Sequence, residues 1–201
     1  MARIGLLALQ GGFAAHAQCL AALGHDCVEV RRPEQLVGLE GLVLPGGEST
    51  TQLKLIASAG LGPGLRALVA AGGPVLATCA GLILAARQVQ APQQESFGWL
   101  DLTVQRNAHG RQVESFEGWS DRGRKLVFIR APRIVAVGAA VEVLDTLRGE
   151  PILVRQGRVV GACFHPELSD SLGVHELVFG AAVDDRAREV LRPLRLAAEA
   201  G

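Results

Sequence analysis

In VLATCAGLILAA, residues Val75–Ala86, a buried strand pattern leads directly into a helical pattern. Its first four residues are apolar or small and are typical of a strand that is covered on both faces. Cys79 follows at once, and a helical pattern over residues 81–89 begins after it. A strand that turns straight into a helix is typical of parallel α/β sheets, so we expect this class of fold.

The rest of the first half repeats this alternation of strand and helix. Short apolar runs that end in glycine-rich turns alternate with segments of helical periodicity. We expect strands at residues 3–9, 27–30, 41–44 and 75–78, and helices at residues 14–23, 50–59, 63–71 and 81–89. This order predicts an α/β fold, a mostly parallel central sheet with helices on both faces.

The second half has a different character. Between residues 99 and 164, strand-like segments follow one another with few helical intervals, which predicts antiparallel strands attached to the parallel sheet. Helical patterns return at residues 170–183 and 184–200. Because no repeat, low-complexity linker or compositional break divides the chain, we predict a single domain over residues 1–201.

Composition argues against several classes of protein. The chain has 201 residues, and its 20 basic and 20 acidic side chains give a formal net charge of zero. Nothing therefore indicates a nucleic-acid groove or an anionic membrane surface as partner. No segment resembles a signal peptide or approaches about 18 uninterrupted apolar residues, which favours a cytoplasmic location. The four cysteines form no CxxC pair and no metal-type spacing with histidine, so we expect reduced thiols and no metal.

Cys79 has two interpretations. Cysteine is among the most buried residue types, so packing is the more common role of such a residue. At a sharp strand-to-helix turn, however, its side chain would be exposed at the carboxyl edge of the sheet. The first amides of the helix, beginning at Ala80, would point to the same place and could stabilise an oxyanion during acyl transfer. Cys79 is therefore a candidate nucleophile, whereas we expect Cys19, Cys27 and Cys163 in the core.

A nucleophilic cysteine needs a base, and the segment GACFHPELSD offers one. His165 follows a strand pattern, and Glu167 lies two residues further on, where an extended chain projects side chains to the same side. Glu167 could orient one imidazole nitrogen while the other faces Cys79. Alone, HPE is equally compatible with a polar loop after a strand. Because open α/β sheets bind ligands at strand carboxyl ends, the two segments support each other.

A set of ordered motifs resembles a known family. TCAGL followed by FHPE is similar to the class I, or triad, glutamine amidotransferases. The motifs LALQG, LPGGESTT, RNAHGRQVESFE, FIRAP and FHPEL occur in the order and near the spacings of the glutaminase subunits of pyridoxal 5′-phosphate synthases. The resemblance covers residues 3–170 and implies a class I amidotransferase fold with a flavodoxin-like core.

The resemblance implies a role for each matching residue. Cys79 would attack the side-chain amide of L-glutamine to form a glutamyl thioester, and His165, oriented by Glu167, would move the proton. The turn at Gly47 would also face the oxyanion. The substrate-binding residues that it implies are Gly47, Glu48, Ser49, Arg106, Ile129 and Arg130. Arginine suits the carboxylate of the substrate, although a solvated position is the more common fate of any single arginine.

The resemblance also implies a partner. Free ammonia is soon protonated and is then no longer a nucleophile. A separate synthase subunit of TIM-barrel type would therefore receive the ammonia within a hetero-oligomer and make pyridoxal 5′-phosphate. Pyridoxal phosphate would be the product of that assembly, and we expect no cofactor in this chain.

Two departures from the family pattern and two alternative functions stay open. The family has glycine at the position of Ala77, which precedes Thr78 at the strand-to-helix turn, and phenylalanine at the position of His109 in RNAHGRQ. The same triad could serve a different amidotransferase acceptor. The chain could also be a non-catalytic scaffold of this fold, in which Cys79 has a structural or redox role.

Overall fold

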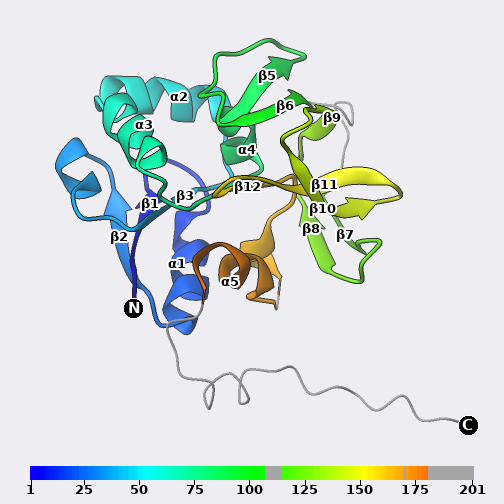
Figure 1. Ribbon diagram of the computed structural model, residues 1–201, viewed down its shortest axis with the longest axis horizontal. Helices are drawn as coiled ribbons and strands as arrows, with labels where there is room; N and C mark the ends of the chain where they lie inside the picture. The colour runs from blue at the N-terminus through cyan, green and yellow to red at the C-terminus, as the bar shows by residue number, and fades with distance from the viewer. Residues whose placement is uncertain (107–114, 170, 181–201) are drawn as a thin grey trace, which may run out of the picture.

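The computed structural model describes residues 1–106, 115–169 and 171–180. Figure 1 shows a central sheet with helices on both sides and smaller sheets toward one end. The second helix expected near the C-terminus, residues 184–200, lies outside the described residues.

A seven-stranded sheet forms the centre of the fold. Its strands are β1 (Arg3–Leu7), β2 (Asp26–Val30), β3 (Gly41–Leu44), β4 (Val75–Thr78), β10 (Glu142–Leu147), β11 (Glu150–Gln156) and β12 (Val159–Ala162). They lie in the order β10-β11-β12-β4-β3-β1-β2. The last five strands of that order are mutually parallel, whereas β11 is antiparallel to both of its neighbours. The predicted mostly parallel sheet is confirmed, and its parallel part has the flavodoxin-like order.

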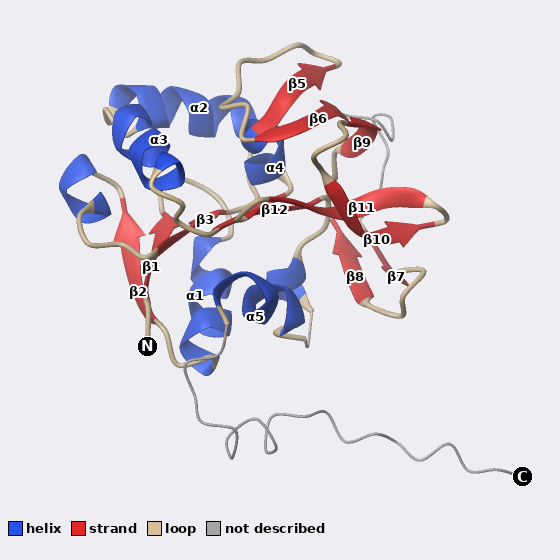
Figure 2. Ribbon diagram, viewed as in Figure 1, coloured by secondary structure: helices blue, strands red, loops and turns tan. Residues whose placement is uncertain are grey.

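Helices cover both faces of this sheet, as predicted. On one face lie α1 (Phe13–Ala22) and α5 (Gly173–Phe179), and on the other lie α2 (Ser49–Ser58), α3 (Gly62–Ala70) and α4 (Ala80–Ala85) (Figures 1 and 2). Two short 3-10 turns, η1 (Pro33–Leu36) and η2 (Pro166–Leu168), complete the described helical elements. No single described helix is long and apolar enough to cross a membrane. Taken together, α2 and α3 have the length and composition of a membrane span, but the pair is bent by 100°.

The second half adds two small sheets, in line with the strand-rich pattern of that region. One sheet contains β5 (Ala86–Gln90), β6 (Leu100–Gln105) and β9 (Arg133–Val137), and the other contains β7 (Phe116–Trp119) and β8 (Lys125–Phe128). β6 pairs antiparallel with β9 and β7 with β8, but β5 and β6 are parallel. The predicted antiparallel layer is therefore present, with one parallel pair inside it.

The helix expected over residues 81–89 is wrong in its second half. α4 ends at Ala85, and residues 86–90 form β5. Every residue of α4 is buried, whereas Arg87, Gln88 and Gln90 are exposed. Residues 86–90 pair with β6 through backbone hydrogen bonds, and this pairing decides the conformation of the segment. Tertiary pairing overrides the local helical preference here.

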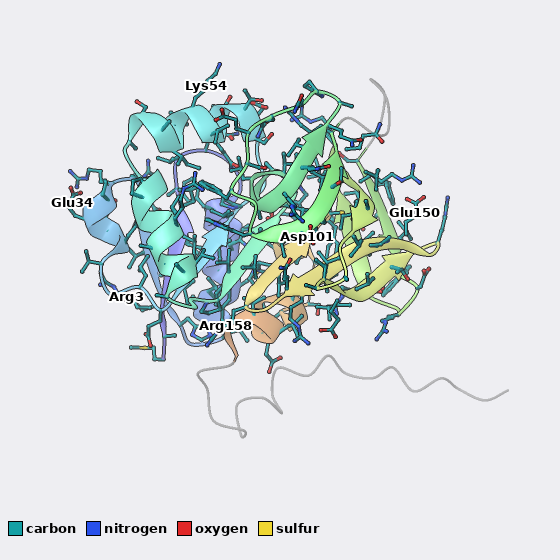
Figure 3. All side chains as sticks on the ribbon, turned by 45° about the horizontal axis from the view of Figure 1, so that its top comes forward. Arg3, Glu34, Lys54, Asp101, Glu150 and Arg158 are labelled. Carbon is teal, nitrogen blue, oxygen red and sulfur yellow. The ribbon has the colours of Figure 1, made fainter. Side chains whose placement is uncertain are left out.

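The core lies on both sides of the central strands. Every residue of β3, β4 and β12 is buried, which explains their uninterrupted apolar runs. α4 approaches β3 so closely that a Cβ built on Gly81 would lie 2.0 Å from the Leu44 carbonyl oxygen. Charged side chains such as Glu34, Lys54 and Glu150 project from the outer surface (Figure 3). Gly81 thus allows the helix that follows Cys79 to pack directly on the sheet.

Candidate active site

The carboxyl ends of three neighbouring strands meet at the candidate site. β3, β4 and β12 are adjacent and parallel, with Leu44 opposite Ala77 and Ala162 opposite Thr78. The segments that follow the three strands therefore all begin at the same edge of the sheet, where the carboxyl ends of the strands lie. The segments that follow carry the PGGEST turn, the elbow cysteine and the HPE motif, and they line one cavity of about 310 Å³.

Cys79 occupies a strained elbow between β4 and α4. Its φ of 48° and ψ of −103° lie outside the regions that residues with a side chain normally adopt. Its amide donates to the Ala162 carbonyl at 2.9 Å, and its thiol lies 3.8 Å from the Ile129 carbonyl oxygen, which accepts. The residue is 6% exposed. Backbone strain of this kind gathers at functional sites, where it aims a side chain into a cavity.

The surroundings of Ala77 suit alanine, although the resemblance predicts glycine at this position. Ala77 lies within β4, is fully buried and is not among the described residues with a positive φ. The conformation that favours glycine falls on Cys79, two residues later. Alanine therefore fits this position without backbone strain.

His165 and Glu167 form a buried pair beside the elbow. The His165 amide donates to the Val127 carbonyl at 2.8 Å, which ties the residue to β8. Its Nδ1 donates to Glu167 Oε1 at 2.7 Å, because a carboxylate can only accept. Nε2 makes no hydrogen bond within the described part of the chain, and the residue lines the cavity. The imidazole thus keeps one nitrogen for chemistry while the other is held by Glu167.

Electrostatics strengthen this pair. Burial favours the neutral imidazole, but the neighbouring Cys79 and Glu167 outweigh it and raise the pKa of His165 above its ordinary value. Burial also opposes ionisation of Glu167, but the hydrogen bond from His165 and the nearby imidazole of His16 lower the pKa of that carboxyl. The site therefore favours transfer of the Cys79 thiol proton to His165, which gives an imidazolium beside the Glu167 carboxylate.

Hydrogen bonds with two glutamines, Gln10 and Gln52, fix the PGGEST turn. Gln10 accepts the Glu48 amide through its Oε1 at 2.9 Å. Gln52 donates from Nε2 to the Gln10 carbonyl at 3.1 Å and to the Pro45 carbonyl at 3.2 Å. These bonds fix the backbone of the turn, so that Gly47 lines the cavity in a defined conformation.

Glu48 caps α2. Its carboxylate accepts from the amides of Thr50 at 3.0 Å and Thr51 at 2.7 Å, and from the Thr51 hydroxyl at 2.6 Å. Partial burial opposes ionisation, but these hydrogen bonds from Thr51 and Thr50 lower the pKa of Glu48 to about 2. Glu48 is therefore a carboxylate at neutral pH.

Arg106 extends over the same turn. Its Nη2 donates to Glu48 Oε1 at 3.2 Å and to the Thr50 hydroxyl at 3.1 Å. Arg106 lines the cavity, so the guanidinium is held in place with further N–H groups that can donate. Arg130, in contrast, is exposed and has a φ of 45°. Among the described residues, the site thus presents one oriented and one exposed cation to an anionic ligand.

The structure brings the sequence-predicted site residues to one place, apart from Ala80. The cavity is lined by Gly47, Glu48, Ser49, Cys79, Arg106, Ile129, Arg130, His165 and Glu167. Ala80 is buried as the first residue of α4 and is not among the lining residues. His109, the other departure from the family pattern, lies outside the described residues.

One contact in the site was not anticipated from the sequence. The imidazole of His165 packs against the Cα of Gly46. A Cβ built on Gly46 would lie 2.3 Å from Cε1 of the ring. The two glycines in PGGEST were the available signal, but a sequence cannot say which of them touches a side chain 119 positions away.

The fold and the residues at its strand ends together define a class of protein. A flavodoxin-like sheet with a cysteine on a strand-to-helix elbow, beside a His–Glu pair in the segment that follows the neighbouring strand, is the arrangement of the class I glutamine amidotransferases.

The family follows from comparison with known proteins. Residues 6–183 match the family described as SNO glutamine amidotransferase, and the chain belongs to this family. The protein of Koribacter versatilis named pyridoxal 5′-phosphate synthase subunit PdxT is 53% identical over 180 residues, which cover 87% of this chain and 93% of that protein. The protein of the same name from Deinococcus radiodurans is 48% identical over 189 residues, covering 89% and 96%.

Solved structures agree with this assignment. A structure described as a glutamine amidotransferase superposes with a TM-score of 0.81 at 44% identity, covering 87% of this chain and 96% of the other. PurLQS from Thermotoga maritima superposes with a TM-score of 0.61 at 17% identity, covering 90% and 93%, which shows the shared fold alone. The predicted fold class is confirmed.

Proposed function

We propose that this chain hydrolyses L-glutamine and passes the ammonia to a synthase subunit that makes pyridoxal 5′-phosphate. The observation that carries the proposal is the convergence of Cys79, His165 and Glu167 on one cavity, in a chain of the SNO glutamine amidotransferase family. The name shared by the relatives from K. versatilis and D. radiodurans supports the choice of synthase.

Cys79 is the proposed nucleophile. Its thiol proton passes to His165 Nε2, and the sulfur adds to the side-chain amide carbon of glutamine. The tetrahedral intermediate collapses when the imidazolium returns that proton to the amide nitrogen, which leaves as ammonia. A glutamyl thioester on Cys79 remains. Water then adds to the thioester while His165 takes its proton, and collapse of this second intermediate releases glutamate and restores the thiol.

Glu167 orients the proposed base. Its hydrogen bond to Nδ1 leaves Nε2 as the nitrogen that exchanges protons. It also stabilises the imidazolium that forms when Cys79 loses its proton. We assign the oxyanion hole to the backbone amides of Gly47 and Ala80, which lie at the turn after β3 and at the start of α4.

The remaining residues of the site are proposed to bind the substrate. Arg106 suits the α-carboxylate of glutamine because Glu48 and Thr50 already hold its guanidinium, which reduces the entropy lost on binding. We assign Glu48, Ser49, Ile129 and Arg130, which line the same cavity, to the rest of the amino acid. The carbonyl of Ile129 is an acceptor close to Cys79, suited to an N–H of the substrate.

We further propose that residues 1–201 act as one glutaminase domain. The continuity of the family match over residues 6–183 supports this. Its partner would be a separate TIM-barrel-type subunit in a hetero-oligomer, since ammonia must be transferred before it is protonated. The cytoplasmic location and the lack of a cofactor stay predictions from the sequence.

A glutaminase assay tests the function. Glutamate release from L-glutamine is measured with and without the synthase subunit, and pyridoxal 5′-phosphate formation is measured in the complex with glutamine as the nitrogen source. We expect both products in the complex and weaker glutamate release by the chain alone. Failure of the complex to release glutamate would contradict the proposal, and glutamate release without pyridoxal phosphate would point to a different acceptor.

A further inference from the structure

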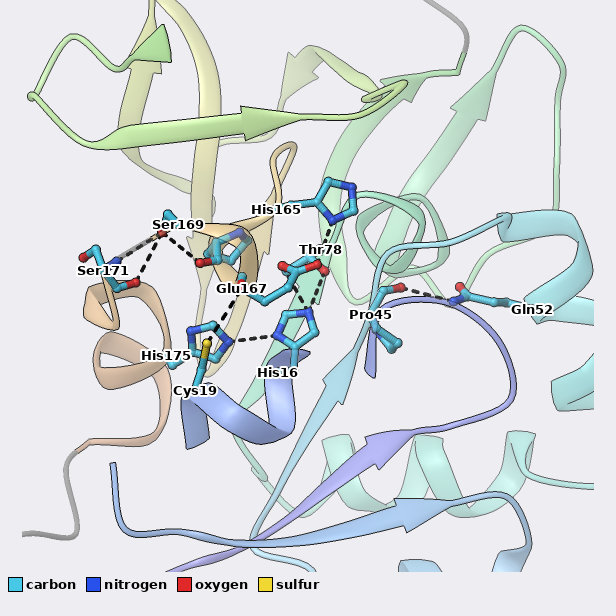
Figure 4. Close-up of polar contacts among 11 residues, drawn as sticks. His16, Cys19, Pro45, Gln52, Thr78, His165, Glu167, Ser169, Ser171 and His175 are labelled. Atoms are coloured by element: carbon cyan, nitrogen blue, oxygen red, sulfur yellow. Dashed lines mark hydrogen bonds and ion pairs between the residues drawn. The ribbon is translucent and has the colours of Figure 1, made fainter. Parts of the chain in front are cut away.

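A pair of fully buried histidines lies behind the candidate site. His16 on α1 and His175 on α5 are both 0% exposed, although 159 positions separate them in the chain. His16 Nδ1 lies 2.8 Å from His175 Nε2, which makes one hydrogen bond between the two rings. Figure 4 shows this pair beneath Glu167, on the side away from His165. Neither residue lines the cavity, so any effect on the reaction must pass through another side chain.

Glu167 is that side chain. Its Oε1 is occupied by His165 Nδ1 at 2.7 Å, whereas its Oε2 is buried and makes no well-aligned hydrogen bond within the described residues. His16 Nε2 lies 3.3 Å from this Oε2 and 3.2 Å from the Thr78 hydroxyl oxygen. A buried carboxylate oxygen without a donor is strongly destabilising. His16 therefore supplies the N–H that faces the second oxygen of the carboxylate.

The protons of the two histidines can be assigned from their surroundings. Burial lowers the pKa of His16 to about 4, although Glu167 opposes the change. Burial, together with His16, lowers the pKa of His175 to about 3. Both rings are therefore neutral at physiological pH, and each carries a single N–H. The contact between His16 and Glu167 is thus that of a neutral donor with a carboxylate rather than an ion pair.

The carboxylate selects the tautomer. A proton on His16 Nε2 faces the oxygens of Glu167 and Thr78, whereas the other tautomer would turn a lone pair toward a negative charge. His16 Nδ1 is then an acceptor, so His175 Nε2 donates to it. His175 Nδ1 is left without a proton, and it has no hydrogen-bond partner in the described part of the chain. The donors thus point in one direction, from His175 to His16 to Glu167.

We propose that His16 is a positioning residue that holds the Glu167 carboxylate against His165, and that His175 fixes the tautomer in which His16 can do so. With His165 bonded to Oε1 and His16 Nε2 at 3.3 Å from Oε2, rotation of Glu167 away from His165 is restrained, and the base stays aimed at Cys79. This inference rests on the proposed function of the Cys79–His165–Glu167 set. It adds helices α1 and α5 to the elements that hold the reacting groups in place.

The test compares two substitutions of His16 in the complex with the synthase. His16→Leu removes the donor and keeps a bulky side chain, whereas His16→Gln keeps an amide N–H near the position of Nε2. The readouts are kcat and KM for glutamine, and the rate at which iodoacetamide alkylates Cys79, followed on the Cys79 peptide. We expect His16→Leu to lower kcat and the alkylation rate by about 10-fold with KM unchanged, and His16→Gln to recover most of the loss.

A matched control separates positioning from stability. His25 is also a buried, hydrogen-bonded histidine, which contacts the Ala2 amide and the Gly180 carbonyl away from the cavity. His25→Leu should lower the melting temperature without changing kcat or Cys79 alkylation. His175→Leu should reduce kcat in the same sense as His16→Leu, because the tautomer of His16 is no longer fixed.

Three results would overturn the inference. These are unchanged kcat and alkylation in His16→Leu, a loss in His16→Gln as large as in His16→Leu, and a loss in His25→Leu equal to that in His16→Leu. The alkylation rate keeps this test separate from the proposed function. If the wild-type complex releases no glutamate, the function is wrong, yet the reactivity of Cys79 still decides the role of His16.

Discussion

The imidazole of His165 rests on the Cα of Gly46, in the space that any side chain at position 46 would occupy. A Cβ at this position would lie 2.3 Å from Cε1 and 3.0 Å from Nδ1 of the ring. The turn that follows β3 thus sets the place of the residue that follows β12. Two motifs far apart in the sequence, PGGEST and FHPEL, act as one structural unit through this contact.

Gly46→Ala should therefore displace His165 and lower kcat by about 100-fold, because an imidazole moved by about 1 Å no longer meets the thiol. The measurement is glutamate release by the complex, with circular dichroism to check folding. Gly62→Ala is the matched control, since a Cβ at Gly62 would meet no atom within 4 Å. Equal activity in the two variants would contradict the argument.

Of the two variants that lack the Cys79 thiol, the glycine variant should be more stable than the alanine variant. Cys79→Ala and Cys79→Gly both remove the thiol and should both abolish glutamate release. The φ of 48° and ψ of −103° strain any residue with a Cβ but not glycine. Cys79→Gly should therefore unfold with a free energy about 1 kcal/mol higher than that of Cys79→Ala in denaturant titrations. A less stable glycine variant would mean that the elbow is not strained in solution.

Glu48 should make the stability of the chain depend on pH in the acid range. Its pKa is lowered from 4.5 to about 2 in the folded state, so the carboxylate stabilises the fold above its unfolded pKa, and this contribution is lost as pH falls toward 2. Because the side chain is 45% exposed, the contribution should be only about 1 kcal/mol.

The comparison that checks this is wild type against Glu48→Gln, by urea titration at pH 6 and at pH 3. The difference in unfolding free energy should be largest at pH 6 and should shrink at pH 3. A difference that is the same at both values would show that Glu48 does not act as a carboxylate cap.

Arg106→Lys should raise KM for glutamine by about 10-fold and change kcat little. Lysine keeps the charge but lacks the planar group that donates to Glu48 and Thr50 and presents further N–H groups to a carboxylate. Steady-state kinetics of the complex give both constants. The control is Arg158→Lys, which changes an exposed arginine away from the cavity. A loss confined to kcat would assign Arg106 to the chemical step.

Ala77→Gly, which introduces the glycine that the resemblance predicts at this position, should not raise kcat. Ala77 is fully buried in β4 and its φ is not positive. Glycine there removes a packed methyl group and loosens the unfolded chain, at a cost of about 1 kcal/mol. Thermal unfolding and kcat measure the two effects. An increase in kcat would indicate that the alanine distorts the elbow.

Much of this protein can be predicted from short segments because each of them has one dominant physical signal. The continuous apolar runs at β3, β4 and β12 require cover on both faces, and that requirement implies a parallel sheet. A parallel sheet in turn places Cys79 and His165 at the same edge. Glu167 follows from its distance of two residues from His165, and the structure pairs the two at 2.7 Å.

Other features could not be predicted, because distant parts of the chain decide them. Residues 86–90 leave the helical pattern to pair with β6. Gly46 touches His165 only because β3 and β12 flank β4 in the sheet. Neither relation has a local signature.

The fold class, the motif set and the candidates for nucleophile, base and orienting carboxylate can all be read from the sequence, since these depend on residue types and on spacing along one strand or turn. The contacts that hold those groups in place become visible in the folded chain alone. His16 and His175 meet because α1 and α5 pack on the same face of the sheet, 159 positions apart in the chain, and burial there keeps both rings neutral. Hydrogen bonds of this kind depend on distance in space, which no local pattern records.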